Sequence, residues 1–169
     1  KSRNNIKQSK ENYLYRIRKK TASLFETATW SGSVLANMHT NEHEQLGQFG
    51  MNLGHAFQIF DDIRDFTDLN NKINNSGKNI GIDINNGILT LPVILSLENN
   101  FESNPFYNAI KSNEEINVND LGIYLIHEGF IQQASSIGNM YIQKAINNLK
   151  HFKSNEITDI LFEIANSIK

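Results

Sequence analysis

The chain has 169 residues, and its 16 Lys and Arg against 18 Asp and Glu give a formal net charge of −2 at pH 7. This balance argues against nucleic acid as a main partner, because binding along phosphates requires a surplus of basic residues on one face. The chain has no Cys, which excludes disulfides, Cys-ligated metals and thiol nucleophiles and favours a cytoplasmic location, and no run of about 20 apolar residues predicts a transmembrane helix.

Two long helices are predicted in the first part of the chain. Apolar residues recur at three- and four-residue spacing from about 11 to 36, and again from about 44 to 68. Asn41 and Glu44 have the spacing of a capping box, which predicts the start of the second helix. Residues 69–82 combine Asn, Ser and Gly without a period, which is typical of a loop.

Shorter helices are predicted in the rest of the chain. Their ranges are 90–99, 106–112, 119–128, 130–150 and 154–168. Pro92 suits the first turn of a helix, and Gly129 suits a helix end. No alternating run predicts a strand, so the sequence indicates an all-α helical bundle in one packed unit.

Aspartate is concentrated on the second long helix. Four of the chain's seven Asp fall within eight residues, at 61, 62, 65 and 68. Gln58, Asp61, Asp62 and Asp65 lie within an arc of about 100° on that helix. Neighbouring carboxylates repel one another unless a cation lies among them, and Mg²⁺ prefers oxygen ligands shared with a substrate phosphate. An acidic face exposed to solvent is the alternative for the D-D-x-x-D pattern alone.

Histidine and aromatic residues give weaker signals. His39 and His43 have the spacing of a metal pair, but a helix boundary is expected between them and no third ligand is evident. The aromatic residues of the central helices are expected in the core, namely Trp30, Phe49, Phe57 and Phe60.

The acidic cluster lies within an ordered set of short motifs. Lys-Thr stands at 20–21, Phe-Gln at 57–58, G-K-x-x-G-x-D at 77–83 and T-L-P at 90–92. In this order and spacing the chain resembles the C-terminal half of a trans-isoprenyl diphosphate synthase, of the polyprenyl synthetase family. It is most similar to the bacterial heptaprenyl and geranylgeranyl diphosphate synthases.

The resemblance implies a fold and a domain organisation. Residues 1–169 would be the C-terminal helices of a single all-α domain, a helical bundle of the isoprenoid synthase type. The N-terminal half, with the first aspartate-rich motif and the isopentenyl diphosphate site, would not be part of this chain. One departure is Ile88, which stands where the family often has a lysine that contacts diphosphate.

The resemblance also implies roles for individual residues. The implied metal ligands, for Mg²⁺, are Asp61, Asp62 and Asp65. The implied substrate-binding residues are Lys20, Thr21, Phe57, Gln58 and Lys78, with the two lysines on the allylic diphosphate. The residues implied to be catalytic are Lys20, Thr21, Gln58 and Asp61.

The activity implied is a Mg²⁺-dependent prenyl transfer. An allylic prenyl diphosphate would condense with isopentenyl diphosphate to give a polyprenyl diphosphate, and this chain alone would be inactive. A homodimer is expected, with a heterodimer as the other possibility. A non-catalytic regulatory subunit of a heteromeric prenyl synthase is the main alternative. A class I terpene cyclase is a further one, against which the G-K-x-x-G-x-D motif argues.

Overall fold

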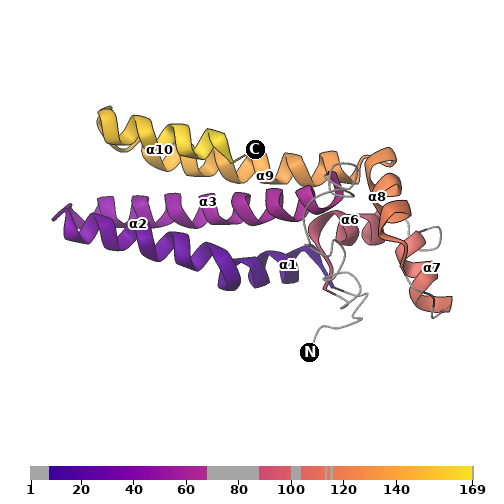
Figure 1. Ribbon diagram of the computed structural model, residues 1–169. Helices are drawn as coiled ribbons and strands as arrows, with labels where there is room; N and C mark the ends of the chain where they lie inside the picture. The colour runs from indigo at the N-terminus through magenta and orange to yellow at the C-terminus, as the bar shows by residue number, and fades with distance from the viewer. Residues whose placement is uncertain (1–7, 68–87, 100–103, 113, 115, 169) are drawn as a thin grey trace, which may run out of the picture. The chain divides into compact units, whose positions relative to one another are not determined.

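The computed structural model describes residues 8–67, 88–99, 104–112, 114 and 116–168. Within these ranges the chain is helical with short connections and has no strand (Figure 1), which confirms the all-α prediction. The predicted loop at 69–82, and Lys78 with it, lies outside the described residues. In the described part of the chain, none of the long helices combines the length and the apolar character that a bilayer crossing requires.

The first predicted helix is interrupted by a π-helical turn. Its three consecutive segments are α1 (Lys10–Ile17), η1 (Arg18–Ala22) and α2 (Ser23–Leu35). The apolar spacing predicts the full helical extent but does not reveal the change of hydrogen-bond pattern at η1. Insertions of this kind are rare, and they occur frequently at functional sites.

Helix α3 (Thr40–Thr67) is the second long helix. It begins earlier than predicted, because the His39 carbonyl accepts hydrogen bonds from the N–H groups of Glu42 and His43. The Glu42 carboxylate in turn accepts a hydrogen bond of 2.8 Å from the His39 N–H. The predicted capping pair of Asn41 and Glu44 is therefore wrong, since Glu42 is the third residue of the helix and makes that contact.

The remaining predicted helices are present with small shifts of their ends. They are α6 (Leu91–Asn99), α7 (Pro105–Ser112), α8 (Val118–His127), α9 (Phe130–Leu149) and α10 (Glu156–Ser167). Pro92 lies in the first turn of α6, and Gly129 follows α8 with a φ of +80°, both as predicted. Asn155 and Thr158 form a reciprocal capping box at the start of α10.

The chain divides into two compact units, and each is described by itself. The first unit comprises residues 1–13 and 61–135, and the second comprises 14–60 and 136–169. The boundaries fall inside α1, α3 and α9, so α3 carries Gln58 in the second unit and the acidic cluster in the first.

The second unit is built on close contact between α3 and the η1–α2 segment. A Cβ added at Gly54 would lie 2.6 Å from the Ala22 Cα, and one added at Gly50 would overlap the Phe25 carbonyl oxygen. No side chain larger than hydrogen fits at these two positions without moving backbone. The Thr29 hydroxyl also donates a hydrogen bond of 2.7 Å across to the Leu46 carbonyl.

The first unit has its own apolar core. Residues 91–97 of α6 are all buried, so this helix is surrounded rather than amphipathic. The Asn104 side chain, fully buried, donates 2.7 Å to the Ser96 hydroxyl and accepts 2.9 Å from the Phe106 N–H. This amide fixes the start of α7 against α6.

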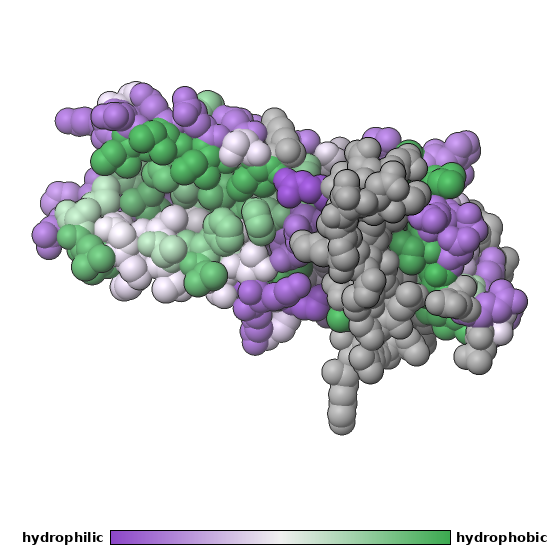
Figure 2. Space-filling model, in the orientation of Figure 1, coloured by the Kyte–Doolittle hydropathy of each residue, from purple (hydrophilic) through white to green (hydrophobic). Residues whose placement is uncertain are grey.

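The predicted aromatic core is only partly present. Phe49 and Phe60 are buried as predicted, but Trp30 is 48% exposed and Phe57 is 39% exposed. They belong to a larger set of exposed apolar residues of the second unit: Leu24, Trp30, Val34, Leu35, Phe57, Ile157, Ile160, Phe162 and Ile164. Figure 2 shows a broad apolar band over this part of the molecule. The core prediction for Trp30 and Phe57 is therefore wrong. Apolar spacing identifies an apolar face of a helix, but it does not show whether another part of the protein covers that face.

Candidate active site

Two residues from separate sequence motifs meet in the second unit. The Thr21 hydroxyl, on η1, donates a hydrogen bond of 2.6 Å to the Oε1 atom of Gln58, on α3. Gln58 is buried and Thr21 is half-buried. The contact is possible because Gly54, one helical turn before Gln58, lets Ala22 and its neighbour Thr21 approach α3 closely.

Lys20 and Phe57 flank this pair in the sequence, and both are exposed. Lys20 lies on η1 beside Thr21. The Phe57 ring, on α3, contacts the Phe25 ring, on α2, with centroids 5.5 Å apart. The two rings form an apolar surface, and Phe57 directly precedes Gln58 in the sequence. An aromatic pair with one exposed ring, Phe57, and one half-buried ring, Phe25, fits a wall for an apolar ligand better than a core position.

The acidic cluster lies on the last two turns of α3, in the first unit. Asp61 is exposed, whereas Asp62 and Asp65 are half-buried. The Asp62 Oδ2 atom accepts a hydrogen bond of 2.7 Å from the Tyr13 hydroxyl, and Tyr13 is fully buried. Sequence reasoning did not single out Tyr13, because no motif contains it and its partner is 49 residues away.

The carboxylates fit one kind of metal site and not another. Among the described residues, no group of three His, Asp or Glu side chains is placed to hold a metal ion by itself. Mg²⁺ does not need such a cage, because it keeps several waters and is commonly bound by one or two carboxylates together with substrate phosphates. Asp61, Asp62 and Asp65, on exposed or half-exposed helix positions, suit that partial ligand set.

Two histidines are engaged in contacts within the second unit. His43 Nδ1 lies 2.9 Å from the hydroxyl of buried Ser33, which accounts for one member of the His39 and His43 pair. His55 Nδ1 lies 2.8 Å from the Met51 carbonyl oxygen, and its ring stacks on Tyr141 at 4.8 Å.

The environment of His55 disfavours its charged form. Burial lowers the pKa of His55 below its ordinary value, and the positive charges of Arg18 and Lys144 lower it further. The hydrogen bond to Met51 opposes this shift. His55 is therefore a neutral packing residue at pH 7.

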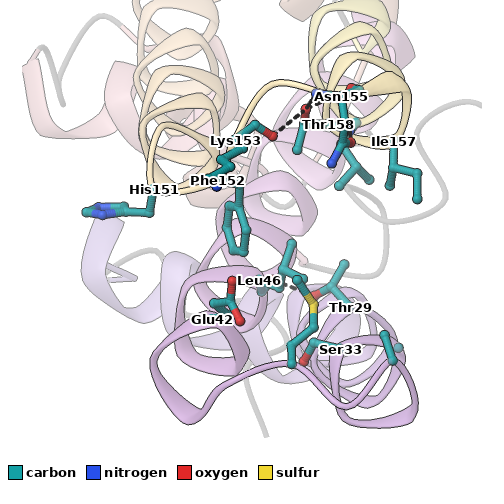
Figure 3. Close-up of a pocket in the computed structure, with 14 residues that line it drawn as sticks. Thr29, Ser33, Glu42, Leu46, His151, Phe152, Lys153, Asn155, Ile157 and Thr158 are labelled. Atoms are coloured by element: carbon teal, nitrogen blue, oxygen red, sulfur yellow. Dashed lines mark hydrogen bonds between the residues drawn. The ribbon is translucent and has the colours of Figure 1, made fainter.

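A cavity of about 710 Å³ is also present in the second unit. Figure 3 shows Leu46 and Thr29 on its α2–α3 side and Phe152 on the segment between α9 and α10. It adjoins the first turns of α3, whereas Gln58 lies near the other end of that helix, 12 residues after Leu46 and about 18 Å along the axis. No motif marked its residues in the sequence.

Comparison with known proteins identifies the family. The sequence profile of the Polyprenyl synthetase family matches residues 1–125. The chain belongs to the polyprenyl synthetase family. The "Heptaprenyl diphosphate synthase component 2" of Bacillus subtilis (strain 168) is 29% identical over 168 residues, which are 99% of this chain and 47% of that protein. The chain thus spans about half the length of this curated relative.

Solved structures of polyprenyl synthases have the same fold. A polyprenyl synthase from Caulobacter crescentus CB15, complexed with calcium and isoprenyl diphosphate, matches 99% of this chain and 51% of its own, with a TM-score of 0.86 and 29% identity. A heptaprenyl diphosphate synthase from Staphylococcus aureus matches 97% of this chain and 51% of its own, with a TM-score of 0.85 and 27% identity. The predicted isoprenoid synthase type of helical fold is confirmed.

Proposed function

We propose that this chain is the part of a Mg²⁺-dependent trans-prenyltransferase that carries its second aspartate-rich wall. The whole enzyme condenses an allylic prenyl diphosphate with isopentenyl diphosphate to make a polyprenyl diphosphate. Membership of the polyprenyl synthetase family supports the reaction class. The observation that carries the proposal is the 2.6 Å hydrogen bond between Thr21 and Gln58, since it brings together two residues that the sequence assigns to the same site.

The reaction breaks one bond and forms another. The bond between the allylic carbon and the diphosphate oxygen breaks, the C=C of isopentenyl diphosphate attacks that carbon, and one proton is lost. Bound Mg²⁺ supplies positive charge that stabilises the departing diphosphate. Lys20 and Lys78 add cationic charge for the same anion.

The residues of the second unit act on the carbon end of the substrate. The hydroxyl oxygen of Thr21 and the amide oxygen of Gln58 are the negative ends of their dipoles, and they favour positive charge developing on the allylic carbon. Their mutual hydrogen bond holds both groups in place before the substrate binds. Phe57 and Phe25 offer an apolar surface that keeps water from the reactive carbon.

The chain alone is expected to be inactive. Its carboxylates provide only a partial ligand set, and the apolar band in Figure 2 is the kind of surface that a further layer of helices covers. The complementary half would come from the same polypeptide, in a cytoplasmic homodimer, or from a partner subunit. The name "component 2" of the Bacillus subtilis relative supports a heteromeric arrangement as the second possibility.

A regulatory subunit is the competing function. The Bacillus subtilis relative is named as one component of a heptaprenyl diphosphate synthase, and that name is the observation that raises a subunit with a separate role. A regulatory subunit would tolerate loss of the acidic cluster, because it would not need to bind diphosphate. A catalytic part would not tolerate it.

The test is prenyl transfer by the product of the complete reading frame that contains this sequence. Labelled isopentenyl diphosphate is supplied with farnesyl diphosphate and Mg²⁺, and the label in longer prenyl diphosphates is counted. Asp61→Asn should lower turnover by at least about 100-fold, the usual effect of removing one group that stabilises developing charge. The matched control is Asp120→Asn, at an exposed position of α8. Full activity in the Asp61 variant would contradict the proposed catalytic role of the acidic cluster, and absence of prenyl transfer by the parent product would favour the regulatory subunit.

A further inference from the structure

We propose that Tyr13 is a positioning residue that fixes the carboxylate of Asp62 for binding of a divalent cation and diphosphate. This inference rests on the proposed function, and it adds a residue that none of the motifs contains. Its basis is the hydrogen bond of 2.7 Å from the Tyr13 hydroxyl to Asp62 Oδ2, which joins α1 to α3 within the first unit.

The chemistry of the contact makes it strong. Tyr13 is fully buried, so its ring has no freedom to swing away and its hydroxyl must find a partner inside the protein. A hydroxyl that donates to an ionised carboxylate forms a charge-assisted bond, shorter and about twice as strong as a neutral one. The contact therefore holds both the rotamer of Asp62 and the orientation of its carboxylate plane.

The contact also orients the carboxylate before a cation arrives. The Oδ2 atom of Asp62 accepts the hydrogen bond from Tyr13, so the carboxylate group is held in one orientation. A carboxylate that is already oriented loses less conformational freedom when it binds. Groups that orient metal ligands in this way typically change metal affinity by about 10- to 100-fold when they are removed.

Phenylalanine at position 13 isolates the effect of the hydroxyl. Tyr13→Phe keeps the ring that fills the core and removes the hydroxyl that donates to Asp62. Tyr124→Phe is the matched control, because Tyr124 is in the same unit and its ring packs on Phe130 at 6.0 Å. Asp62→Asn removes the charge that Tyr13 is proposed to orient.

The experiment measures the affinity of the complete reading-frame product for Mn²⁺ in the presence of inorganic pyrophosphate. Free Mn²⁺ is followed by electron paramagnetic resonance, and folding of each variant is checked by circular dichroism. We expect about 10-fold weaker binding for Tyr13→Phe and no change for Tyr124→Phe. In the Tyr13→Phe/Asp62→Asn double variant, the loss should be no greater than for Asp62→Asn alone, because Tyr13 acts only through Asp62.

Three outcomes overturn the inference, and they are distinguishable. Equal binding by the parent reading-frame product and Tyr13→Phe removes the positioning role and leaves the proposed function intact. Losses that add in the double variant show a general structural effect of Tyr13 rather than action through Asp62. Absence of binding by the parent reading-frame product overturns the diphosphate-binding wall itself, and the positioning role with it.

Discussion

Gly54 is the position at which a single methyl group should separate the two helices that carry Thr21 and Gln58. A Cβ at this position would lie 2.6 Å from the Ala22 Cα, 3.1 Å from its Cβ and 3.2 Å from the Phe25 Cβ. The closest of these atoms is backbone, so no side chain can turn away to make room. Gly54→Ala must therefore shift η1 relative to α3, and the hydrogen bond of 2.6 Å from Thr21 to Gln58 is lost.

The magnitude follows from two opposing effects. Replacing glycine by alanine inside a helix favours the folded state by about 1 kcal/mol, through helix propensity. Forcing an extra methyl group into a close-packed interface costs about 1–3 kcal/mol. The loss of the Thr21 hydrogen bond adds about 1 kcal/mol. We expect Gly54→Ala to lower the free energy of unfolding by about 1–3 kcal/mol, or several degrees in Tm for a chain of this size.

Gly32→Ala is the matched control, since a Cβ at that position of α2 meets no atom within 4 Å. It should raise the free energy of unfolding by about 0.5–1 kcal/mol, through propensity alone. Urea unfolding followed by circular dichroism at 222 nm compares the two variants with the parent chain. If Gly54→Ala is as stable as Gly32→Ala, the close approach of η1 and α3 is refuted, together with the reason given for the Thr21–Gln58 contact.

Three further predictions concern stability. Gly129→Ala should lower the free energy of unfolding by about 1–2 kcal/mol, because the φ of +80° disfavours any Cβ; an unchanged urea midpoint would argue against this turn. Asn104→Ala should lower the free energy of unfolding by about 1–3 kcal/mol, because the Ser96 hydroxyl oxygen loses its donor and the Phe106 N–H loses its acceptor. Thermal unfolding measures the effect, and an unchanged Tm would show that water or a neighbouring group replaces the amide. The pKa of His55 is lowered in the folded chain, so the unfolded chain binds the proton more readily. The contribution of neutral His55 to the free energy of unfolding should therefore be complete above pH 6.5 and should decrease as the pH falls below 6.5. His55→Phe should flatten that slope, and an identical pH profile would contradict the assignment.

Local patterns predicted most of the helices because their signals are short-range. The apolar period gives the extent of α3, and Pro92 and Gly129 mark one helix start and one helix end. The N-cap of α3 is His39, two residues before the predicted Asn41, because Glu42 and Glu44 offer the same capping chemistry and only the backbone geometry distinguishes them.

The candidate site residues come from the order of motifs along the chain rather than from helix periodicity. That order singles out Thr21 and Gln58, and the structure joins them by a hydrogen bond. The π-helical turn at Arg18–Ala22 and the contact from Tyr13 to Asp62 are tertiary features with no local signature. The exposure of Phe57 also depends on what covers the helix, which apolar spacing does not encode.

Binding of an allylic diphosphate tests the central claim most directly. Isothermal titration calorimetry would measure the affinity of the complete reading-frame product for farnesyl diphosphate, with and without Mg²⁺, for the parent protein and Asp61→Asn. We expect Mg²⁺-dependent binding that weakens by at least about 10-fold in Asp61→Asn, because the variant loses one carboxylate that holds the cation to which the diphosphate binds. Equal affinity in the variant, or the same affinity without Mg²⁺, would contradict the assignment of the acidic cluster on α3 to diphosphate binding.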